Sequence, residues 1–420
     1  MERMEILPGV TLTAVQMQKF KTGSLSVNFL RPLCKEEAPL NALLPSVLLR
    51  GTVHYPDMRS LSAALEECYG AEIGGTVRKK GEVQAAGLYA DFMDDRLAAG
   101  EQVAQRVVSL VAEILLRPRM ENGCFCADFV KQEQDNLINA IRSRINSKRA
   151  YAASQTVKAM FRGEAYAVDR LGEEAEASAI TPTSLTEYYR RWLSESPIEI
   201  CYIGSLSANQ IATMLTQAFS DLPRTTLVHP TTTILSLRRE PQEIRETMDI
   251  TQGKLCLGFR TDLTARDPEW TAMTVFATVY GSGVTSKLFC NVREKQSLCY
   301  YAAASLERFK GLMLVSSGID FEQFETAKAA ILREWKACCD GVISETELSS
   351  AKTQLISSLQ ALEDSPAQMD ESYLGQAICG VWCDITDRIE DIRAVTVDDV
   401  SAAAQRLVLD TVYFLEGAEA

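Results

Sequence analysis

Two side chains that can hold a peptide stand close together in the segment Arg293-Glu-Lys-Gln-Ser-Leu-Cys-Tyr300. The guanidinium of Arg293 is a planar fork of hydrogen-bond donors that suits the carbonyl oxygens of an extended chain. The hydroxyl of Tyr300 can donate to an oxygen that becomes negative when water attacks a scissile carbonyl. The spacing alone also fits a structural interpretation, in which Arg293 stabilises a helix end and Tyr300 is a half-buried strand residue.

The chain is poor in histidine, a residue much used as a general base and as a zinc ligand. Its 420 residues include only two, His54 and His229, and no spacing joins either one to a partner that could ligate zinc. No nucleophile-elbow motif flanks a serine or a cysteine. The turn Gly281-Ser-Gly283 is too short for a phosphate-binding loop. We therefore expect neither a complete catalytic site nor a bound metal in this chain.

Composition narrows the class of protein further. The formal net charge of -13 argues against a nucleic-acid partner, because phosphate contacts need a basic surface. Residues 1–10 lack the apolar core of a signal peptide, and no stretch is apolar for long enough to predict a membrane span. The twelve cysteines show neither a zinc-finger spacing nor the short secreted chain that disulfide frameworks need. We expect a cytoplasmic protein with free thiols that binds neither nucleic acid nor membrane.

The first half of the chain predicts a defined order of helices and strands. Leu61, Ala64, Leu65 and Cys68 recur at helical spacing, and Gly70 suits the end of that helix. A helix precedes it and two strands joined by a Lys-Lys-Gly turn follow it, before a long helix closes the group. The expected ranges are 38–49 for the first helix, 71–78 and 82–92 for the strands, and 100–115 for the long helix.

The second half repeats this order. Gly51 and Gly281 occupy matching places in the two halves, as do Gly70 and Tyr300. The expected ranges are 269–280 and 286–295 for helices, 298–306 and 312–319 for strands, and 321–339 for the closing helix. Each half continues with helices and ends in an apolar strand: 128–147, 150–161 and 198–204 in the first, and 345–363, 370–380 and 412–415 in the second. The pattern indicates a duplicated domain of about 200 residues, although two unrelated α+β domains would also fit it.

The mixture of strands and runs of helices, without strict alternation, predicts an α+β fold with mainly antiparallel sheets packed by helices. The stretch 223–243 has little periodicity and contains Pro230 and Pro241, which favours a linker. We therefore expect an N-terminal domain over 1–222, a linker over 223–243 and a C-terminal domain over 244–420.

The segment from Gly281 to Tyr300 resembles the C-terminal half of the insulinase/pitrilysin zinc peptidases. Members of that family carry a glycine-containing turn, then Ser-x-Leu-Phe, then Arg-Glu-Lys, then Leu-x-Tyr, and this chain has the last three as Ser286-Lys-Leu-Phe289, Arg293-Glu-Lys295 and Leu298-Cys-Tyr300. The duplicated organisation extends the resemblance over nearly the whole chain. It implies two α/β-sandwich domains of the LuxS/MPP-like metallopeptidase fold. It also implies that Arg293 and Tyr300 bind substrate and stabilise the transition state opposite a metal.

The chain departs from the family where the metal should be held. Active members carry His-x-x-Glu-His on the helix before a Gly-Thr pair, and there two histidines ligate zinc while the glutamate activates water. Here Ala42, Pro45 and Ser46 stand at those motif positions. A further glutamate ligand is expected near Asn139 and Ala140, and it is missing too. The resemblance therefore implies a degenerate metal site and no zinc in this chain.

These observations predict a protein that is not an enzyme by itself: the non-catalytic subunit of a cytosolic heterodimeric zinc peptidase. A paralogue bearing His-x-x-Glu-His would hold the zinc, and this chain would bind the peptide substrate through Arg293 and Tyr300. A homodimer is the alternative assembly. The alternative function is a non-enzymatic scaffold or assembly protein of the same fold, since some histidine-poor relatives are linked with modification of elongation factor P. A third hypothesis is an active enzyme whose chemistry its motifs do not reveal.

Overall fold

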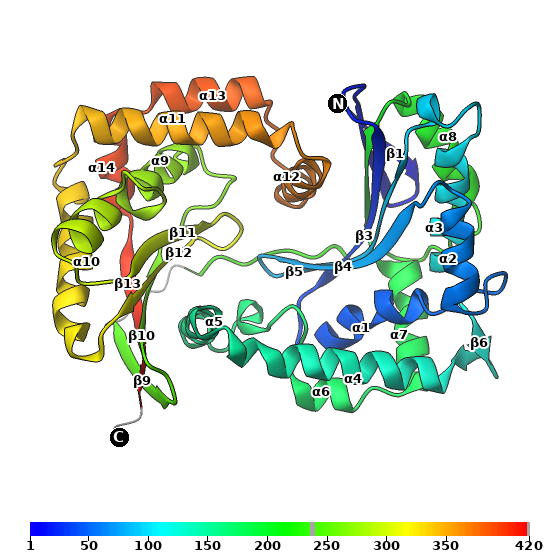
Figure 1. Cartoon of the computed structure of the whole chain (residues 1–420), viewed down its shortest axis with the longest axis horizontal. Coiled ribbons are helices and arrows are strands. Elements are labelled where there is room, and N and C mark those ends of the chain that lie inside the picture. The colour runs from blue at the N-terminus through cyan, green and yellow to red at the C-terminus, as the bar shows by residue number, and fades with distance from the viewer. Residues whose placement is uncertain (236–239, 418–420) are drawn as a thin grey trace. The chain divides into compact units, whose positions relative to one another are not determined.

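The computed structural model describes residues 1–235 and 240–417, and in these ranges the chain forms two compact units (Figure 1). Each unit also contains a short segment from the opposite half of the sequence. Unit 1 comprises Met1–Arg142, Val168–Thr231 and Ser365–Ile378, and unit 2 comprises Ser143–Ala167, Thr232–Asp364 and Cys379–Ala420. The domain and linker boundaries expected at 222 and 243 stay a prediction.

Unit 1 is built on a six-stranded sheet in the order β1-β2-β8-β3-β5-β4. Neighbouring strands are antiparallel except β2 and β8, which are parallel. The strands are Glu2–Leu7 (β1), Val10–Gln16 (β2), Thr22–Pro32 (β3), Glu72–Lys80 (β4), Val83–Met93 (β5) and Ile198–Gly204 (β8). A separate two-stranded sheet pairs Met120–Glu121 (β6) with Cys124–Phe125 (β7).

One face of this sheet carries the apolar core of unit 1, because side chains alternate between the two faces along each strand. Phe29 of β3 stacks on Trp192 with 3.6 Å between ring centroids, and the indole N–H of Trp192 donates to Asn41 Oδ1 at 2.9 Å. The helices of the unit are Ala38–Leu48 (α1), Met58–Glu66 (α2), Val103–Leu116 (α3), Ala127–Ser143 (α4), Glu174–Ser178 (α6), Pro182–Glu195 (α7) and Ala208–Ala218 (α8), with a 3-10 turn at Asp95–Leu97 (η1).

The opposite face of the unit 1 sheet is more polar and contacts the helix Pro366–Cys379 (α12). The carboxylate of Asp370 is buried there, 2.6 Å from the guanidinium of Arg78 on β4. The hydroxyl of Ser26 on β3 also donates to Asp370. Leu374 adds an apolar contact with β3 and β5. A short helix from the second half of the sequence is thus part of the N-terminal sheet's packing.

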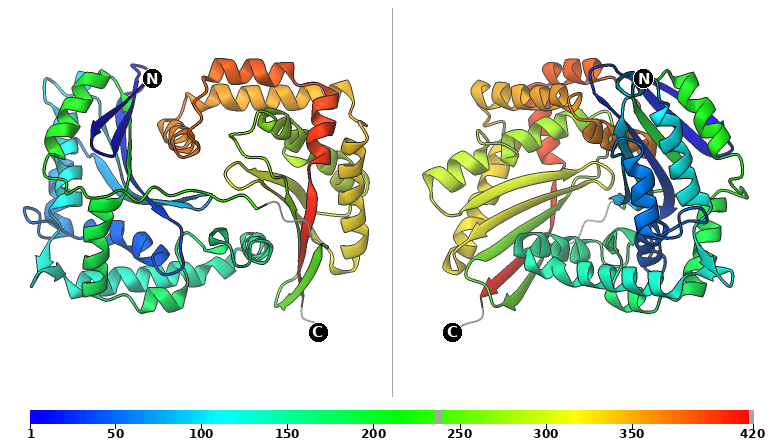
Figure 2. Two further views of the ribbon diagram at one scale, coloured as in Figure 1. Left: turned by 180° about the vertical axis from the view of Figure 1, so that it is seen from behind. Right: turned by 45° about the vertical axis from the view of Figure 1, so that its right-hand side comes forward.

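Unit 2 is built on a five-stranded sheet in the order β11-β12-β10-β13-β9, antiparallel except for the parallel pair β13 and β9. The strands are Gln242–Met248 (β9), Gly253–Arg260 (β10), Tyr301–Glu307 (β11), Leu312–Ile319 (β12) and Val408–Gly417 (β13). Leu255, Val315 and Phe414 point from these strands into the core beneath the helices. The views in Figure 2 show α10 in yellow on this side of the unit 2 strands.

The helical segments of unit 2 divide between the two faces of its sheet. Those on the apolar face are Trp270–Gly281 (α9), the π-helix Leu288–Lys295 (η4), the 3-10 turn Phe321–Gln323 (η5), Phe324–Cys339 (α10), Glu345–Leu362 (α11), Ile385–Ala394 (α13) and Val397–Gln405 (α14). The other face contacts Lys148–Met160 (α5), which is flanked by the 3-10 turns Arg144–Asn146 (η2) and Ala165–Ala167 (η3). The parallel pair beside an otherwise antiparallel sheet occurs in both units.

The predicted fold class, α+β with mainly antiparallel sheets in a duplicated pattern, is confirmed. Several local predictions were wrong. The strand expected at 298–306 begins only at Tyr301, so residues 298–300 precede it. Lys79 and Lys80 were expected in a turn, but they belong to β4 because the ladder continues until Lys80 pairs with Val83. The helix expected at 286–295 is a π-helix that begins at Leu288.

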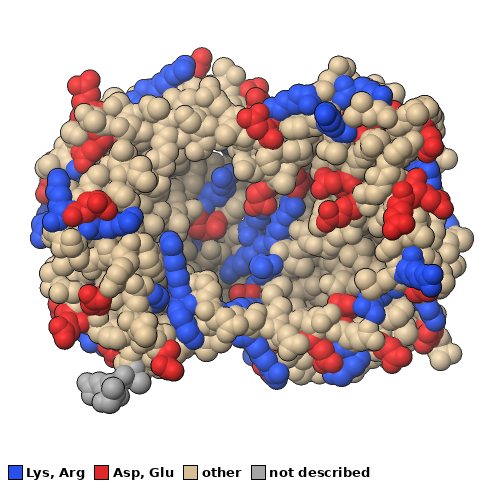
Figure 3. Space-filling view, viewed as in Figure 1, with Lys and Arg blue, Asp and Glu red and all other residues tan. Residues whose placement is uncertain are grey.

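Acidic and basic side chains are interspersed over the outer helices of each unit on the face drawn in Figure 3. The acidic excess of the sequence is therefore not gathered there into one large field. Across residues 1–235 and 240–417, none of the helices combines the length and the apolar character that a membrane crossing requires.

Candidate functional site

Helix α1 carries the three positions that match the metal motif. Ala42 and Pro45 are buried and Ser46 is half-buried. Pro45 lies against β4, since a methyl group added at Gly75 would come within 3.0 Å of the Pro45 Cβ. The helix thus packs on the sheet through the position where the general base is expected. None of the three side chains offers a nitrogen or a carboxylate to a metal ion.

Helix α4 carries the two positions where a further glutamate ligand is expected, Asn139 and Ala140, and both are exposed. The acids nearest to them on this helix are already in ion pairs: Glu133 with Arg50 at 3.1 Å, and Asp135 with a lysine one turn earlier at 2.6 Å. In the part of the chain that the structure describes, no group of three or more His, Cys, Asp or Glu side chains could hold a metal ion. The donors that are present do not fit zinc.

The two histidines lie on the surface of unit 1. The imidazole Nδ1 of His54 is 2.8 Å from the carboxylate of Glu113, and the His54 side chain is exposed. His229 is exposed in a stretch without helix or strand. With Gly9 and Ile198 it lines a cavity of about 390 Å³.

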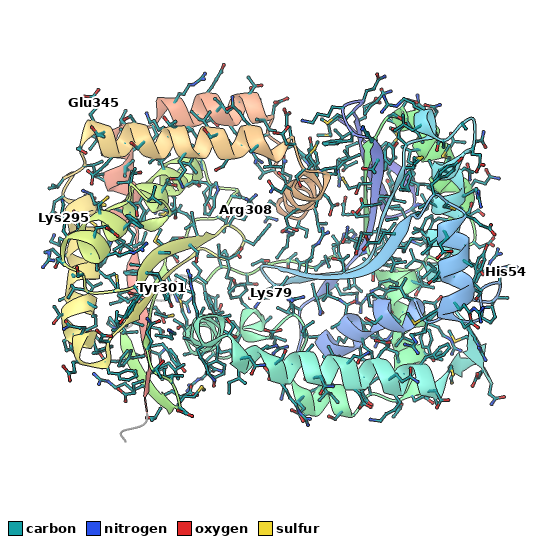
Figure 4. All side chains as sticks on the ribbon, viewed as in Figure 1. His54, Lys79, Lys295, Tyr301, Arg308 and Glu345 are labelled. Carbon is teal, nitrogen blue, oxygen red and sulfur yellow. The ribbon has the colours of Figure 1, made fainter. Side chains whose placement is uncertain are left out.

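Arg293 lies on the π-helix η4, whose wider turn is an uncommon backbone conformation that recurs at functional sites. Its guanidinium is 4.7 Å from the centre of the Phe289 ring and 3.4 Å from the carboxylate of the neighbouring Glu294. The side chain remains 41% exposed, so these contacts orient the guanidinium without enclosing it. Figure 4 labels Lys295 at the end of this helix and Tyr301 at the start of β11, which bracket the rest of the motif.

Tyr300 stands at the entrance to β11, held by its backbone and by its hydroxyl. Its N–H donates to the carbonyl of Gly318 at 2.8 Å, and its hydroxyl donates to Asp320 Oδ1 at 3.2 Å. The residue is 60% exposed. Between the π-helix and Tyr300, Ser297 has a φ of 51°, in the left-handed region that few non-glycine residues adopt. A strained turn therefore presents this tyrosine to solvent.

Arg293 and Tyr300 lie near each other in unit 2, although no direct contact joins them. The link is Cys299, whose thiol faces the core beside Tyr300. Burial raises the pKa of the Cys299 thiol, and the positive charge of Arg293 is close enough to oppose that rise. The structure therefore keeps both predicted site residues out of the core and on the same part of unit 2.

Comparisons with known proteins place this arrangement in a family. The profile described as "Peptidase M16 inactive domain" matches residues 179–355. The protein named "Probable inactive metalloprotease YmfF" from Bacillus subtilis is 32% identical over 412 residues, which is 98% of this chain and 96% of that protein. This chain belongs to the M16 peptidase family. The resemblance to the insulinase/pitrilysin zinc peptidases is thereby confirmed.

One further relative is similar in sequence, and two solved structures are similar in fold. An uncharacterized zinc protease of Mycobacterium tuberculosis is 26% identical over 306 residues, covering 72% of this chain and 68% of that protein. The crystal structure of a conserved protein from Enterococcus faecalis aligns with a TM-score of 0.91 and 28% identity over 99% of this chain and 98% of that one. A structure of a "peptidase M16 inactive domain" from Pseudomonas fluorescens aligns with a TM-score of 0.83 and 17% identity over 100% and 98%.

This M16 protein is an inactive homologue of the family's zinc metallopeptidases. The positions in α1 and α4 explain why, because they hold neither a metal ligand nor a general base that could activate water. What remains is a guanidinium and a phenol that can donate hydrogen bonds to a carbonyl oxygen. Such donors can bind a peptide and stabilise charge on it, but they supply no nucleophile of their own.

The polar side chains on the sheet faces of the M16 protein could not be predicted from the sequence. Asp370 reaches Ser26 and Arg78 only after α12 has docked on unit 1. Arg149 reaches the ring of Tyr301 only through α5. These contacts join residues far apart in the chain, so no local motif predicts them. One signal of such contacts was available in the sequence, the adjacent tyrosines Tyr300 and Tyr301. Adjacent residues of a strand face opposite sides of a sheet.

Proposed function

We propose that this M16 protein is the non-catalytic subunit of a heterodimeric zinc peptidase, whose partner is a paralogue bearing His-x-x-Glu-His. One combination carries the proposal: Arg293 and Tyr300 are accessible to solvent, while the metal positions of α1 and α4 hold no zinc donors. A chain that kept only its architecture would not need a π-helix and a strained serine to present those two side chains. The shared site would thus take its peptide-holding groups from this chain and its metal chemistry from the partner.

The two side chains would act at different places on the peptide. The guanidinium of Arg293 would donate to backbone carbonyl oxygens and hold the extended chain in position. The Tyr300 hydroxyl would donate to the carbonyl oxygen that gains negative charge during hydrolysis. The Tyr300 hydroxyl donates to Asp320 Oδ1 at 3.2 Å, and this hydrogen bond orients the ring. In the complex a peptide oxygen would replace Asp320 as the acceptor.

The substrates we propose are peptides or unfolded segments bound in extended form. Strand β11 is an edge of the unit 2 sheet and begins directly after Tyr300. An extended peptide can add to such an edge as a further strand, with its backbone paired to the protein backbone. That position would bring its carbonyl groups past the tyrosine hydroxyl.

We place the pair in the cytoplasm. All twelve cysteines are free thiols, and most of them are buried. Free thiols are typical of a reducing compartment, where disulfides do not persist.

The test mixes this chain with a His-x-x-Glu-His homologue encoded in the same genome and measures cleavage of an unstructured peptide. Tyr300→Phe should lower kcat about 10²- to 10³-fold, because it removes one donor to the developing negative charge. Arg293→Ala should raise KM, because it removes a group that holds the ground-state peptide.

The matched controls are Tyr69→Phe and Arg333→Ala. Tyr69 is an exposed tyrosine in unit 1 whose hydroxyl donates to a backbone carbonyl. Arg333 is an exposed arginine on α10 that donates to Gln296. Both variants should cleave like the unmodified pair. Full activity of the Tyr300→Phe and Arg293→Ala pairs would contradict the shared site.

A second candidate is a scaffold or assembly protein, including a role in modification of elongation factor P. The observation that favours it is that Arg293 already contacts Phe289 and Glu294, and Tyr300 already donates to Asp320. As structural relics the two would need no further partner. Co-purification discriminates: capture of a His-x-x-Glu-His paralogue by the tagged chain supports the peptidase, and capture of elongation factor P without such a paralogue supports the scaffold.

A further inference from the structure

A row of three residues crosses the face of the unit 2 sheet that contacts α5. Gly318 on β12 pairs with Lys254 of β10 on one side and with Tyr301 of β11 on the other. Cross-strand neighbours point to the same face, so Lys254 and Tyr301 stand on either side of a residue without a side chain. A methyl group at Gly318 would come within 2.5 Å of the Tyr301 ring and 2.9 Å of Gln252 Oε1. The glycine therefore leaves space that the Tyr301 ring and the Gln252 side chain occupy.

A second cation comes to this row from α5. The guanidinium of Arg149 lies 4.2 Å from the centre of the Tyr301 ring, in a cation–π contact. Arg149 is in the first turn of that helix, which is capped by the Ser147 hydroxyl oxygen accepting from the Ala150 N–H. The positive end of the helix dipole therefore adds to the charge of the guanidinium. Figure 4 shows Tyr301 over the unit 2 strands, on the side where α5 lies.

Arg149 is exposed and Lys254 is half-buried, and these two cations lack the acidic partners that the buried cations of unit 2 have. Arg260 lies 2.9 Å from Asp410, Lys310 lies 2.8 Å from Glu164, and Lys287 lies 2.8 Å from a glutamate of α11. By contrast, within residues 1–235 and 240–417 neither Arg149 nor Lys254 forms an ion pair.

The ammonium of Lys254 donates to the neutral Gln252 amide instead. Burial and the nearby charge of Arg149 lower the pKa of Lys254, and no carboxylate opposes that change. The charged or titratable groups that act on Tyr301 are Arg149, Cys256 and Cys299. The acid in the same row of the sheet, Glu246 of β9, is separated from Lys254 by Leu415 of β13 and accepts hydrogen bonds from the hydroxyls of Tyr151 and Tyr413. Two like charges held together without a counter-ion are unfavourable unless an anion joins them.

We propose that Arg149, Lys254 and Tyr301 form a carboxylate-binding subsite that holds the peptide on unit 2. The Arg149 guanidinium donates two parallel hydrogen bonds to a carboxylate, and the Lys254 ammonium donates a third. The Tyr301 ring fixes the plane of the guanidinium. This subsite deepens the proposed peptide-binding function and rests on it. Because Tyr301 follows Tyr300 directly, the carboxylate is held a few residues from the bond that Tyr300 would serve. Both a chain-terminal carboxylate and an acidic side chain have the required chemistry.

The experiment uses the whole chain alone, with its lysines converted to ¹³C-dimethyl-lysine, which keeps their positive charge. The Lys254 methyl signal is identified as the one lost in Lys254→Arg. N-acetyl-alanyl-alanine and N-acetyl-aspartate amide supply the two kinds of carboxylate, and N-acetyl-alanyl-alanine amide and N-acetyl-asparagine amide are their neutral matches. At least one carboxylate should shift the Lys254 signal to saturation while both neutral compounds leave it unmoved.

The variant that tests the geometry is Arg149→Gln, which should weaken carboxylate binding about 10- to 100-fold through loss of charge-assisted hydrogen bonds. Lys336→Gln removes an equal charge from an exposed side chain of α10 and should leave binding unchanged. An unmoved Lys254 signal with both carboxylates, or unaltered affinity in Arg149→Gln, would overturn the subsite.

The outcome separates this inference from the proposed function, because the partner chain is absent from the measurement. A saturable Lys254 response beside a fully active Tyr300→Phe pair would overturn the shared site and leave the subsite standing. No Lys254 response beside a strong effect of Tyr300→Phe would overturn the subsite alone.

Discussion

At the scale of single residues, the account depends on which side chains were lost and which were kept. Pro45 packs against β4 with no group that could take a proton, whereas Tyr300 keeps its hydroxyl at the surface. The loss of the metal motif at Pro45 and the retention of the Arg293 and Tyr300 motif could be predicted from the sequence, because each rests on residue type and on fixed spacing. The packing of Pro45 on β4 and the exposure of Tyr300 are known only from the structure. Arg149 and Lys254 could not be predicted, since their proximity arises only when α5 docks on β10.

Asp94 gives a prediction for the dependence of stability on pH. It is buried after β5 and accepts hydrogen bonds from the backbone N–H of Arg96 at 2.9 Å and from its guanidinium at 2.8 Å. Burial alone would raise the pKa of Asp94, but the hydrogen bonds from Arg96 and Ser205 outweigh it and the pKa is lowered. Its contribution to stability is therefore complete above the ordinary value of about 4. It is lost as the pH falls through the lower value of the folded state.

Asp94→Asn keeps an oxygen that can cap the turn but removes the negative charge that faces Arg96. It should lower the free energy of unfolding at neutral pH by about 1 kcal/mol, the difference between a charged and a neutral hydrogen bond. The difference from the unmodified protein should shrink as the pH is lowered below about 4. Urea unfolding at a series of pH values measures it. Asp91→Asn, at an exposed position of β5, is the control and should change stability by less than about 0.5 kcal/mol at every pH. A difference for Asp94→Asn that stays constant down to acid pH would contradict the assignment.

At the scale of elements, two strands were predicted better than the π-helix and the turn after β4. The ranges expected for β8 and β12 match residue for residue, because both are mainly apolar runs between turn signals. The π-helix η4 was expected as an ordinary helix, since the same apolar spacing fits both forms over so short a segment. The end of β4 was missed because Lys80 continues the strand through its ladder with Val83 and its ion pair with Glu371.

Helix α12 yields a prediction about packing. Asp370 is 5% exposed and lies 2.6 Å from Arg78, so its removal leaves the partly buried guanidinium with only the more distant carboxylate of Glu371, 3.6 Å away. Asp370→Ala should lower the free energy of unfolding by about 2–3 kcal/mol. Hydrogen exchange should show the amides of α12 losing protection before those of β3.

The matched control for Asp370→Ala is Gln368→Ala, two residues earlier on the same helix. Its side chain is exposed. A substitution at such a surface position should change the free energy of unfolding by less than about 0.5 kcal/mol. Equal losses in the two variants would show that helix propensity, and not the buried pair, holds α12 on the sheet.

At the scale of the whole molecule, this chain has the duplicated M16 fold and is 32% identical to the Bacillus subtilis relative. The positions that match the metal motif hold no side chain that could ligate zinc. The fold class could be predicted because its evidence is distributed over the chain: two halves with the same order of elements. The exchange of α5 and α12 between the halves could not, because a helix's own sequence does not state which sheet it will contact.

The central claim is a division of labour, in which this chain holds the peptide and its partner holds the metal. The most direct measurement is the zinc content of each purified chain and of the pair, by elemental analysis. The account predicts no zinc in this chain alone and one zinc in the active pair, lost when the histidines of the partner's His-x-x-Glu-His are replaced. Stoichiometric, tightly bound zinc in this chain on its own would contradict it.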